Sequence, residues 1–174
     1  MNYFLTIKDS DIFENPTEEP QEYIVRPTSK GIVFDDEGNI ALLSIRDHVG
    51  FPGGGVEEGE TFEEAFIREC DEEIGCAVGI ISTIGKARQY RAKDAKQYEF
   101  VYFIAKVVGE IGVPSTSQDD EVGIKVIWLS KEKTGEILER QIKDIPENEY
   151  ARQFNFRTHV AAFKKYLELD TKNN

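Results

Sequence analysis

The residues whose types and spacing are suited to chemistry lie mainly in one acidic segment, residues 57–73. This segment holds nine carboxylates and one basic residue, Arg68, so its net charge is −8. The whole chain of 174 residues carries −12, and most of that charge is therefore concentrated here. Like charges one helical turn apart destabilise a helix, and ordinary surface helices mix the two signs. Some further interaction, such as a bound cation, is expected to offset the crowding.

The same segment has the signals of a helix over residues 62–74. Thr61 and Glu64 have the spacing of a capping box, in which each side chain accepts a hydrogen bond from the backbone N–H of the other. Gly75 is the expected stop signal, because glycine readily adopts the left-handed conformation that follows a helix. Residues 51–60 contain four glycines and a proline and are expected to form a loop.

The helical period places three of the carboxylates together. At about 100° per residue, Glu69, Glu72 and Glu73 fall within a sector of roughly 100°. Glu64 and Asp71 fall on the opposite side, which is expected to face solvent. The adjoining sector is apolar and is expected to face the core; it consists of Phe66, Ile67, Cys70 and Ile74.

A cluster of three carboxylates is suited to a metal ion, because the carboxylates raise one another's pKa unless a cation neutralises them. Oxygen ligands on a helix suit a hard divalent cation, Mg²⁺ or Mn²⁺, which keeps water molecules that a phosphate can replace. The glycine-rich loop allows close approach of the backbone, and the carbonyl of Gly54 is a candidate ligand. On composition alone, a solvated acidic face beside a glycine turn is equally consistent with this segment.

The spacing of the fixed residues in this segment resembles the Nudix box, G-x5-E-x7-R-E-U-x-E-E-x-G-U, in which U is a bulky apolar residue. All seven fixed letters match, and they are Gly54, Glu60, Arg68, Glu69, Glu72, Glu73 and Gly75. The departure from the pattern is cysteine at both U positions, Cys70 and Cys76. Because cysteine packs as a small apolar residue, this departure changes little. The hairpin before the box and the strands after it extend the resemblance to about residues 24–168.

The resemblance implies both an activity and roles for individual residues. The implied reaction is hydrolysis of a nucleoside diphosphate linked to another moiety, in which water attacks the bridging pyrophosphate with the help of Mg²⁺ or Mn²⁺. The implied general base is Glu69 or an acid of a later loop, for which Glu121 is the candidate. Arg68 would orient the carboxylates through charge-assisted hydrogen bonds, and Glu60 would support the loop or a second metal ion. The implied metal ligands are Gly54, through its carbonyl, Glu69, Glu72 and Glu73.

The substrate is less well defined than the reaction. Basic and aromatic side chains near the box are candidates for holding phosphates and stacking a base, although some equally suit a solvated hairpin tip. The sequence allows a modified nucleoside triphosphate, ADP-ribose or a dinucleoside polyphosphate, and also a nucleotide-sensing module without catalysis. An isomerase of the same fold would need a catalytic cysteine, and both cysteines are at expected packing positions. The candidate substrate-binding residues are Arg26, Arg46, Arg88, Tyr90 and Arg91.

The elements that must position these residues are typical of an α+β fold, which the resemblance specifies as an α/β/α sandwich around a mixed sheet. Residues 1–174 are expected to form a single domain. A hairpin is expected around the turn signal at residues 36–39. The predicted elements, in order, are a first strand and loop over 1–23, strands over 22–35 and 40–45, the box helix, strands over 77–91, 97–108 and 122–129, and helices over 133–141 and about 147–168.

Composition and charge exclude several classes of protein. With 33 acidic against 21 basic residues, the surface repels the phosphate backbone of DNA and RNA, so a nucleic-acid polymer is not an expected partner. No apolar run approaches the roughly 18 residues that span a bilayer, so no membrane segment is expected. The N-terminus lacks the pattern of a secretory signal, and a cytoplasmic location is expected. Two histidines, and two cysteines six residues apart, exclude the usual zinc and redox motifs. A homodimer is left open.

Overall fold

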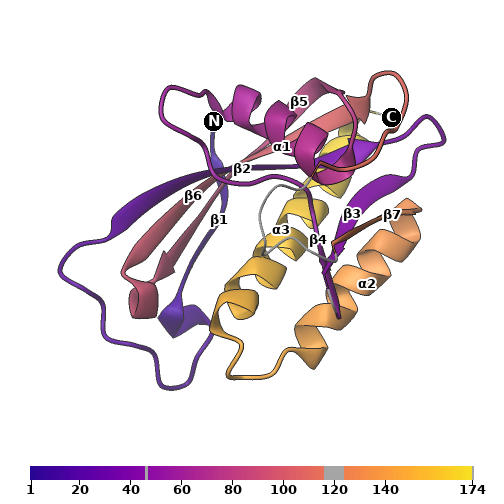
Figure 1. The fold of residues 1–174 in the computed structure, drawn as a ribbon. Helices are drawn as coiled ribbons and strands as arrows, with labels where there is room; N and C mark the ends of the chain where they lie inside the picture. Colours follow the sequence, from indigo (N-terminus) through magenta and orange to yellow (C-terminus); the bar gives the residue numbers. More distant parts are fainter. Residues whose placement is uncertain (46, 116–123, 174) are drawn as a thin grey trace.

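The fold is built on a mixed β-sheet with helices on both of its faces (Figure 1). The computed structural model describes residues 1–45, 47–115 and 124–173. The strands are β1 (Tyr3–Lys8), β2 (Ile24–Phe34), β3 (Ile40–Ile45), β4 (His48–Gly50), β5 (Val78–Arg91), β6 (Lys96–Val107) and β7 (Lys125–Leu129). The helices are α1 (Phe62–Ile74), α2 (Lys131–Asp144) and α3 (Tyr150–Asn173), with 3₁₀ turns η1 (Asp9–Asp11) and η2 (Ala92–Asp94).

The sheet has the strand order β1-β5-β6-β2-β3-β4, and β7 pairs with β3. β2 runs parallel to β6 along its whole length. The turn between β2 and β3 is formed as expected, with Gly38 at a φ of 82°, a conformation that favours glycine. The expected hairpin of these two strands is nevertheless very short, because in the described structure they pair only where Phe34 faces Ile40.

The edge of β2 that β3 leaves open is occupied by the glycine-rich loop before α1. The N–H of Ser29 donates to the carbonyl of Gly54 at 2.8 Å, and the N–H of Gly31 donates to the carbonyl of Pro52 at 3.2 Å. The loop therefore lies against β2 like a short added strand, and its backbone is fixed next to α1.

α1 covers one face of the sheet, and α2 and α3 lie on the other side (Figure 1). The alternation along β6 follows this division. Phe103 stacks on Phe66 of α1 with ring centroids 5.3 Å apart, whereas Tyr102 lies edge-on to His159 of α3. Both cysteines are buried in the apolar cluster under α1, as expected of packing residues. The structure confirms the expected α+β sandwich.

The predicted elements differ from the structure mainly at their ends. α1 and β3 have the predicted bounds, whereas β4 is absent from the prediction because three residues carry too little periodicity. α2 begins earlier than predicted, since Ser130 caps it by accepting a hydrogen bond from the N–H of Lys133 at 3.3 Å. Of the strand predicted over 122–129, residues 125–129 form β7, and residues 122 and 123 lie outside the described part of the chain. Within the part of the chain that the structure describes, no helix has the length and apolar character needed to cross a bilayer.

Candidate functional site

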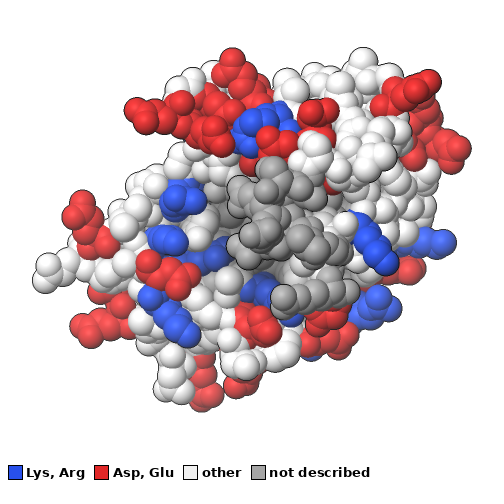
Figure 2. Space-filling view, in the orientation of Figure 1, with Lys and Arg blue, Asp and Glu red and all other residues white. Residues whose placement is uncertain are grey.

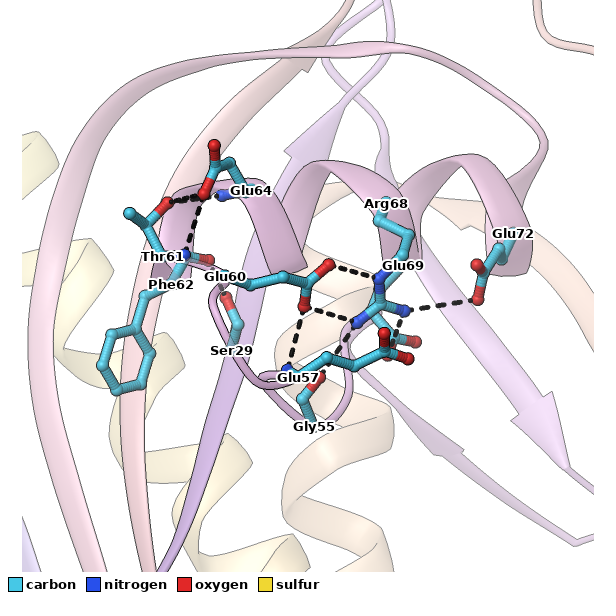
Figure 3. A network of polar contacts seen from close by, with 10 residues as sticks. All are labelled: Ser29, Gly55, Glu57, Glu60, Thr61, Phe62, Glu64, Arg68, Glu69 and Glu72. Atoms are coloured by element: carbon cyan, nitrogen blue, oxygen red, sulfur yellow. Dashed lines mark hydrogen bonds and ion pairs between the residues drawn. The ribbon is translucent and has the colours of Figure 1, made fainter.

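The caps predicted for α1 are formed. The hydroxyl of Thr61 accepts from the N–H of Glu64 at 3.2 Å, and the Glu64 carboxylate accepts from the N–H of Thr61 at 2.9 Å (Figure 3). Gly75 ends the helix with a φ of 68°. The hydroxyl of Ser29 on β2 donates to the carbonyl of Phe62 at 2.6 Å and ties the first turn of α1 to the sheet. These contacts fix the helix, and with it the position of its carboxylates.

The buried face of α1 is rotated toward the carboxylates relative to its prediction. Glu73 is only 8% exposed, and its carboxylate accepts a hydrogen bond from the N–H of Gly53 at 2.6 Å. Ile67 is 41% exposed, so its expected place in the core is wrong. The loop packs over the side of α1 that carries Glu69 and Glu73, and this packing moves the centre of the buried sector. Asp71 is exposed, as expected.

Glycine is required at position 53 of the loop. Gly53 has a φ of 124°, and a Cβ there would overlap the backbone of Ser29. The loop also passes close to the carboxylate of Glu69, which a Cβ at Gly54 would displace from its present position. The carbonyl of Gly54 already accepts one hydrogen bond, from Ser29. Since a carbonyl oxygen has a second lone pair, it can still act as a ligand.

Arg68 connects the loop to the carboxylates. Its Nε and Nη2 donate to the two oxygens of Glu60 at 2.8 and 3.0 Å, and Nη2 also reaches the carbonyl of Gly55 at 3.0 Å. Its Nη1 lies 3.0 Å from Glu69 Oε1 and 3.5 Å from Glu72 Oε2 (Figure 3). The hydrogen bonds from Arg68 lower the pKa of Glu60 to about 2. These contacts are those of a guanidinium that orients Glu69 and Glu72 and is anchored by Glu60.

The carboxylates line a groove of about 640 Å³ between the start of β2, the glycine-rich loop and α1. We call this groove the acidic groove. In Figure 2, acidic side chains gather over α1 at the top of the view, and basic side chains are scattered over the region below. The residues that line the groove are Val25, Arg26, Pro27, Gly54, Gly55, Val56, Glu57, Arg68, Glu69, Glu72 and Glu73.

The acidic groove fits a hard divalent cation by its donor set and by its electrostatics. All candidate ligands are oxygen atoms, as Mg²⁺ and Mn²⁺ prefer. Burial raises the pKa of Glu69 even though Arg68 lies beside it, and a cation would favour its ionised form. Among the described residues, no three acidic, histidine or cysteine side chains are yet gathered as a ligand cluster. Arg68 bridges Glu69 and Glu72 instead.

The predicted substrate-binding residues are separated by the structure. Arg26 lines the acidic groove. Arg88 lies outside that lining, where its guanidinium is bonded to Glu99, to the hydroxyl of Tyr3 at 2.5 Å and to that of Tyr90 at 3.3 Å. Each nitrogen of the Arg88 guanidinium therefore has a partner within the protein. The predicted residues Arg46 and Glu121 lie outside the described part of the chain.

Arg91 is buried, in contrast to Arg88, and only 5% of it is exposed. Its Nη2 donates to Asn155 of α3 at 2.6 Å and its Nε donates to Gln89 at 2.9 Å. The guanidinium lies over the ring of Tyr98, 4.2 Å from its centroid. Arg91 thus connects β5 to α3 and does not reach the acidic groove.

Sequence reasoning missed a second cavity, which lies between β4 and α3 and has a volume of about 140 Å³. Glu73 borders both this cavity and the acidic groove. The sequence feature that could have indicated this cavity is the spacing of Asn155 and His159. They are four residues apart on α3, beside its apolar stripe, and therefore share one helical face. Its polar and charged lining residues are Lys30, His48, Glu73, Arg152, Asn155 and His159.

Comparison with known proteins identifies the family of this chain. The family model of the NUDIX domain matches residues 25–153. The chain therefore belongs to the Nudix family. A curated relative, the 8-oxo-dGTP diphosphatase of Proteus vulgaris, is 43% identical over 54 residues, which are 28% of this chain and 48% of the relative. The match thus spans about half the length of that relative.

Two solved structures have a similar fold. A NUDIX hydrolase from Nitrosomonas europaea has a TM-score of 0.60 at 19% identity, over 83% of this chain and 90% of that one. The E. coli ORF135 protein has a TM-score of 0.55 at 18% identity, over 85% of this chain and 92% of that one. At these identities the likeness concerns the fold alone.

Proposed function

We propose that this protein hydrolyses a pyrophosphate bond in a nucleoside diphosphate linked to another moiety, with Mg²⁺ or Mn²⁺ in the acidic groove. The observation that carries the proposal is the cradle around Glu69, in which Gly54 packs on the carboxylate and Arg68 bridges it to Glu72. Glu69, Glu72, Glu73 and the carbonyl of Gly54 would hold the cation. Because the chain carries −12, a polyphosphate needs such a cation to approach the groove.

The residues of the groove would have different roles in hydrolysis. When bound, the divalent cation supplies charge neutralisation of phosphate oxygens and activation of a water molecule. Arg68 keeps Glu69 and Glu72 aimed into the groove, and Arg26 on its wall is placed to hold a phosphate oxygen. The water proton passes to a general base, for which Glu69 and Glu121 are the candidates.

A modified nucleoside triphosphate is the substrate class we favour. The support is the 8-oxo-dGTP diphosphatase of Proteus vulgaris, whose matching region is 43% identical. Attack of water on a bridging pyrophosphate of such a nucleotide would release a nucleoside monophosphate and inorganic pyrophosphate.

A phosphate-release screen tests the proposal. The panel contains dNTPs, oxidised nucleotides, ADP-ribose, dinucleoside polyphosphates and nucleotide sugars, each with Mg²⁺ and a coupled pyrophosphatase or phosphatase. Glu72→Gln and Glu73→Gln should each lower kcat by at least about 100-fold, because each removes a ligand charge. Asp71→Asn is the matched control, since Asp71 is an exposed acid of the same helix, and it should leave kcat unchanged.

Two results would contradict this function. Unchanged turnover in both Gln variants would exclude the carboxylates from catalysis. Tight nucleotide binding by calorimetry, with no turnover of any compound in Mg²⁺, would instead favour a nucleotide-sensing module.

A further inference from the structure

The cavity between β4 and α3 contains a histidine held in an unusual state. His159 is 6% exposed, and burial, together with the charge of Lys30, lowers its pKa to about 3. The imidazole is therefore neutral at physiological pH, and one of its two nitrogens carries a proton. Its Nδ1 lies 3.3 Å from the hydroxyl of Tyr102, which is completely buried.

The hydroxyl of Tyr102 decides which nitrogen of His159 is protonated. In the described structure, the phenol oxygen has no polar partner other than His159 Nδ1. A buried O–H without an acceptor costs free energy, so the phenol must donate its proton to Nδ1. The proton of the neutral imidazole is then on Nε2, and Nε2–H is a hydrogen-bond donor in a fixed direction.

Gly50 keeps the space beside this donor open. A Cβ at position 50 would lie 3.0 Å from His159 Nε2, closer than side chains normally pack. Gly50 is not among the glycines with a positive φ, so its backbone does not require glycine. Both Gly50 and His159 line the cavity, and Nε2 has no hydrogen-bond partner among the residues that the structure describes.

Asn155 and Lys30 also present donors to the cavity, whereas Glu73, at its border with the acidic groove, is an acceptor. Asn155 accepts from Arg91 through Oδ1, which leaves its NH₂ group for the cavity. Lys30 donates to the carbonyls of Gly53 at 2.5 Å and of Phe51 at 3.2 Å, and a third ammonium proton remains. We therefore call this cavity the donor pocket.

We propose that the donor pocket binds an oxygen acceptor of the substrate, and that His159 is a specificity-determining residue whose Nε2–H donates to that oxygen. This inference rests on the proposed function, since the pocket adjoins the acidic groove through Glu73. The acceptor is a carbonyl oxygen of the base or an oxygen of the phosphate chain. The Nε2–H of His159 rejects an amino group at the same position, because two donors would then face each other unpaired.

Steady-state kinetics with dITP and dATP test the proposal, because these purines differ in a 6-oxo against a 6-amino group. His159→Leu removes the donor, and Gly50→Ala places a methyl group against Nε2 while the imidazole is retained. Each should raise KM for dITP by about tenfold with kcat within about threefold, the loss of one buried hydrogen bond. His159→Gln presents an amide N–H near the Nε2 position and should recover most of the affinity. Thermal melts confirm that each variant is folded.

The two sources of the oxygen give different patterns. If the base carbonyl is bound, the preference for dITP over dATP is lost in His159→Leu. If a phosphate oxygen is bound, KM for both nucleotides rises equally. Either pattern supports the proposal, and a KM unchanged for both nucleotides in folded His159→Leu and Gly50→Ala overturns it.

Binding measurements separate this proposal from the proposed function. Glu72 does not line the donor pocket, so calorimetry with dITP and Mg²⁺ can be done in a Glu72→Gln background. His159→Leu should weaken the dITP Kd by about tenfold there as well. If the wild type hydrolyses no nucleotide but this shift in Kd is seen, the hydrolase function fails and the donor pocket stands. If the wild type hydrolyses nucleotides but His159→Leu causes no shift in Kd, the hydrolase function stands and the donor pocket fails.

Discussion

The acidic groove and the donor pocket both border Glu73, but they differ in the charge of their main polar groups. The groove crowds carboxylates on α1 and keeps one guanidinium, that of Arg68, between them. The pocket contains a buried imidazole that stays neutral and is oriented by a single phenol, that of Tyr102. For the cation that we propose in the groove, the chain tolerates repulsion between like charges. For the proposed substrate oxygen, it orients the neutral donor of His159, which is less costly to bury than a charged one.

Removal of divalent cations should separate the two regions most strongly. Chelation with EDTA is expected to lower turnover by more than about 10³-fold, because the acidic groove then lacks the charge that activates water and neutralises phosphate. Added Mg²⁺ or Mn²⁺ should restore turnover, while circular dichroism shows an unchanged fold throughout. Turnover that persists after complete chelation would contradict the role of the groove.

Acid should destabilise the donor pocket through His159. Its pKa is about 3 in the folded protein and about 6.5 when unfolded, so the unfolded state binds the proton first as the pH falls. The contribution of the neutral imidazole to the free energy of unfolding is fully present above pH 6.5. It is lost as the pH falls from about 6.5 to about 3, by up to about 1.4 kcal/mol per pH unit. Urea unfolding at several pH values measures this loss.

His159→Leu does not titrate, so its stability relative to the wild type should improve as the pH falls through this range. Thr158→Val is the matched control, since Thr158 is a buried polar neighbour on α3 that does not titrate. Its difference from the wild type should be independent of pH. A pH-independent difference for His159→Leu would mean that the imidazole is not held neutral.

The smallest effect is expected at Arg88, whose guanidinium nitrogens each donate a hydrogen bond within the protein, to Glu99, Tyr3 and Tyr90. Arg88→Gln should change KM and kcat by less than about twofold, because the side chain lies outside both regions. Arg26→Gln, on the wall of the acidic groove, should raise KM about fivefold through loss of a charge-assisted contact. Equal effects of the two substitutions would contradict the assignment of Arg26, but not Arg88, to the substrate-binding wall of the groove.

Local signals predicted the acidic groove better than the sheet around it. The bounds of α1 follow from Thr61, Glu64 and Gly75, which act within a few residues of the helix ends. The separation of β2 from β3 does not follow from their alternation, because it depends on a loop that enters the sheet from further along the chain. The exposure of Ile67 has the same cause. Periodicity assigns the carboxylates to one side of the helix, but not the packing that buries Glu73.

The donor pocket could not be predicted because its parts come from distant strands and helices. His159, Tyr102 and Gly50 meet only when α3 packs on the sheet. The spacing of Asn155 and His159 indicates that they share a face of α3, but it does not indicate that the imidazole is buried and neutral. The single-domain organisation, the cytoplasmic location, the absence of a nucleic-acid partner and the homodimer stay predictions.

The loop that lies along β2 has a consequence for how this site can fail. The N–H groups of Ser29 and Gly31 each have one proton to donate, and both are given to the loop. If β3 paired with β2 along their full length, its carbonyls would compete for the same two N–H groups and displace the loop. A continuous sheet and an intact cradle for Glu69 are therefore mutually exclusive, and a substitution that lengthened the hairpin would abolish the site while leaving a well-paired sheet.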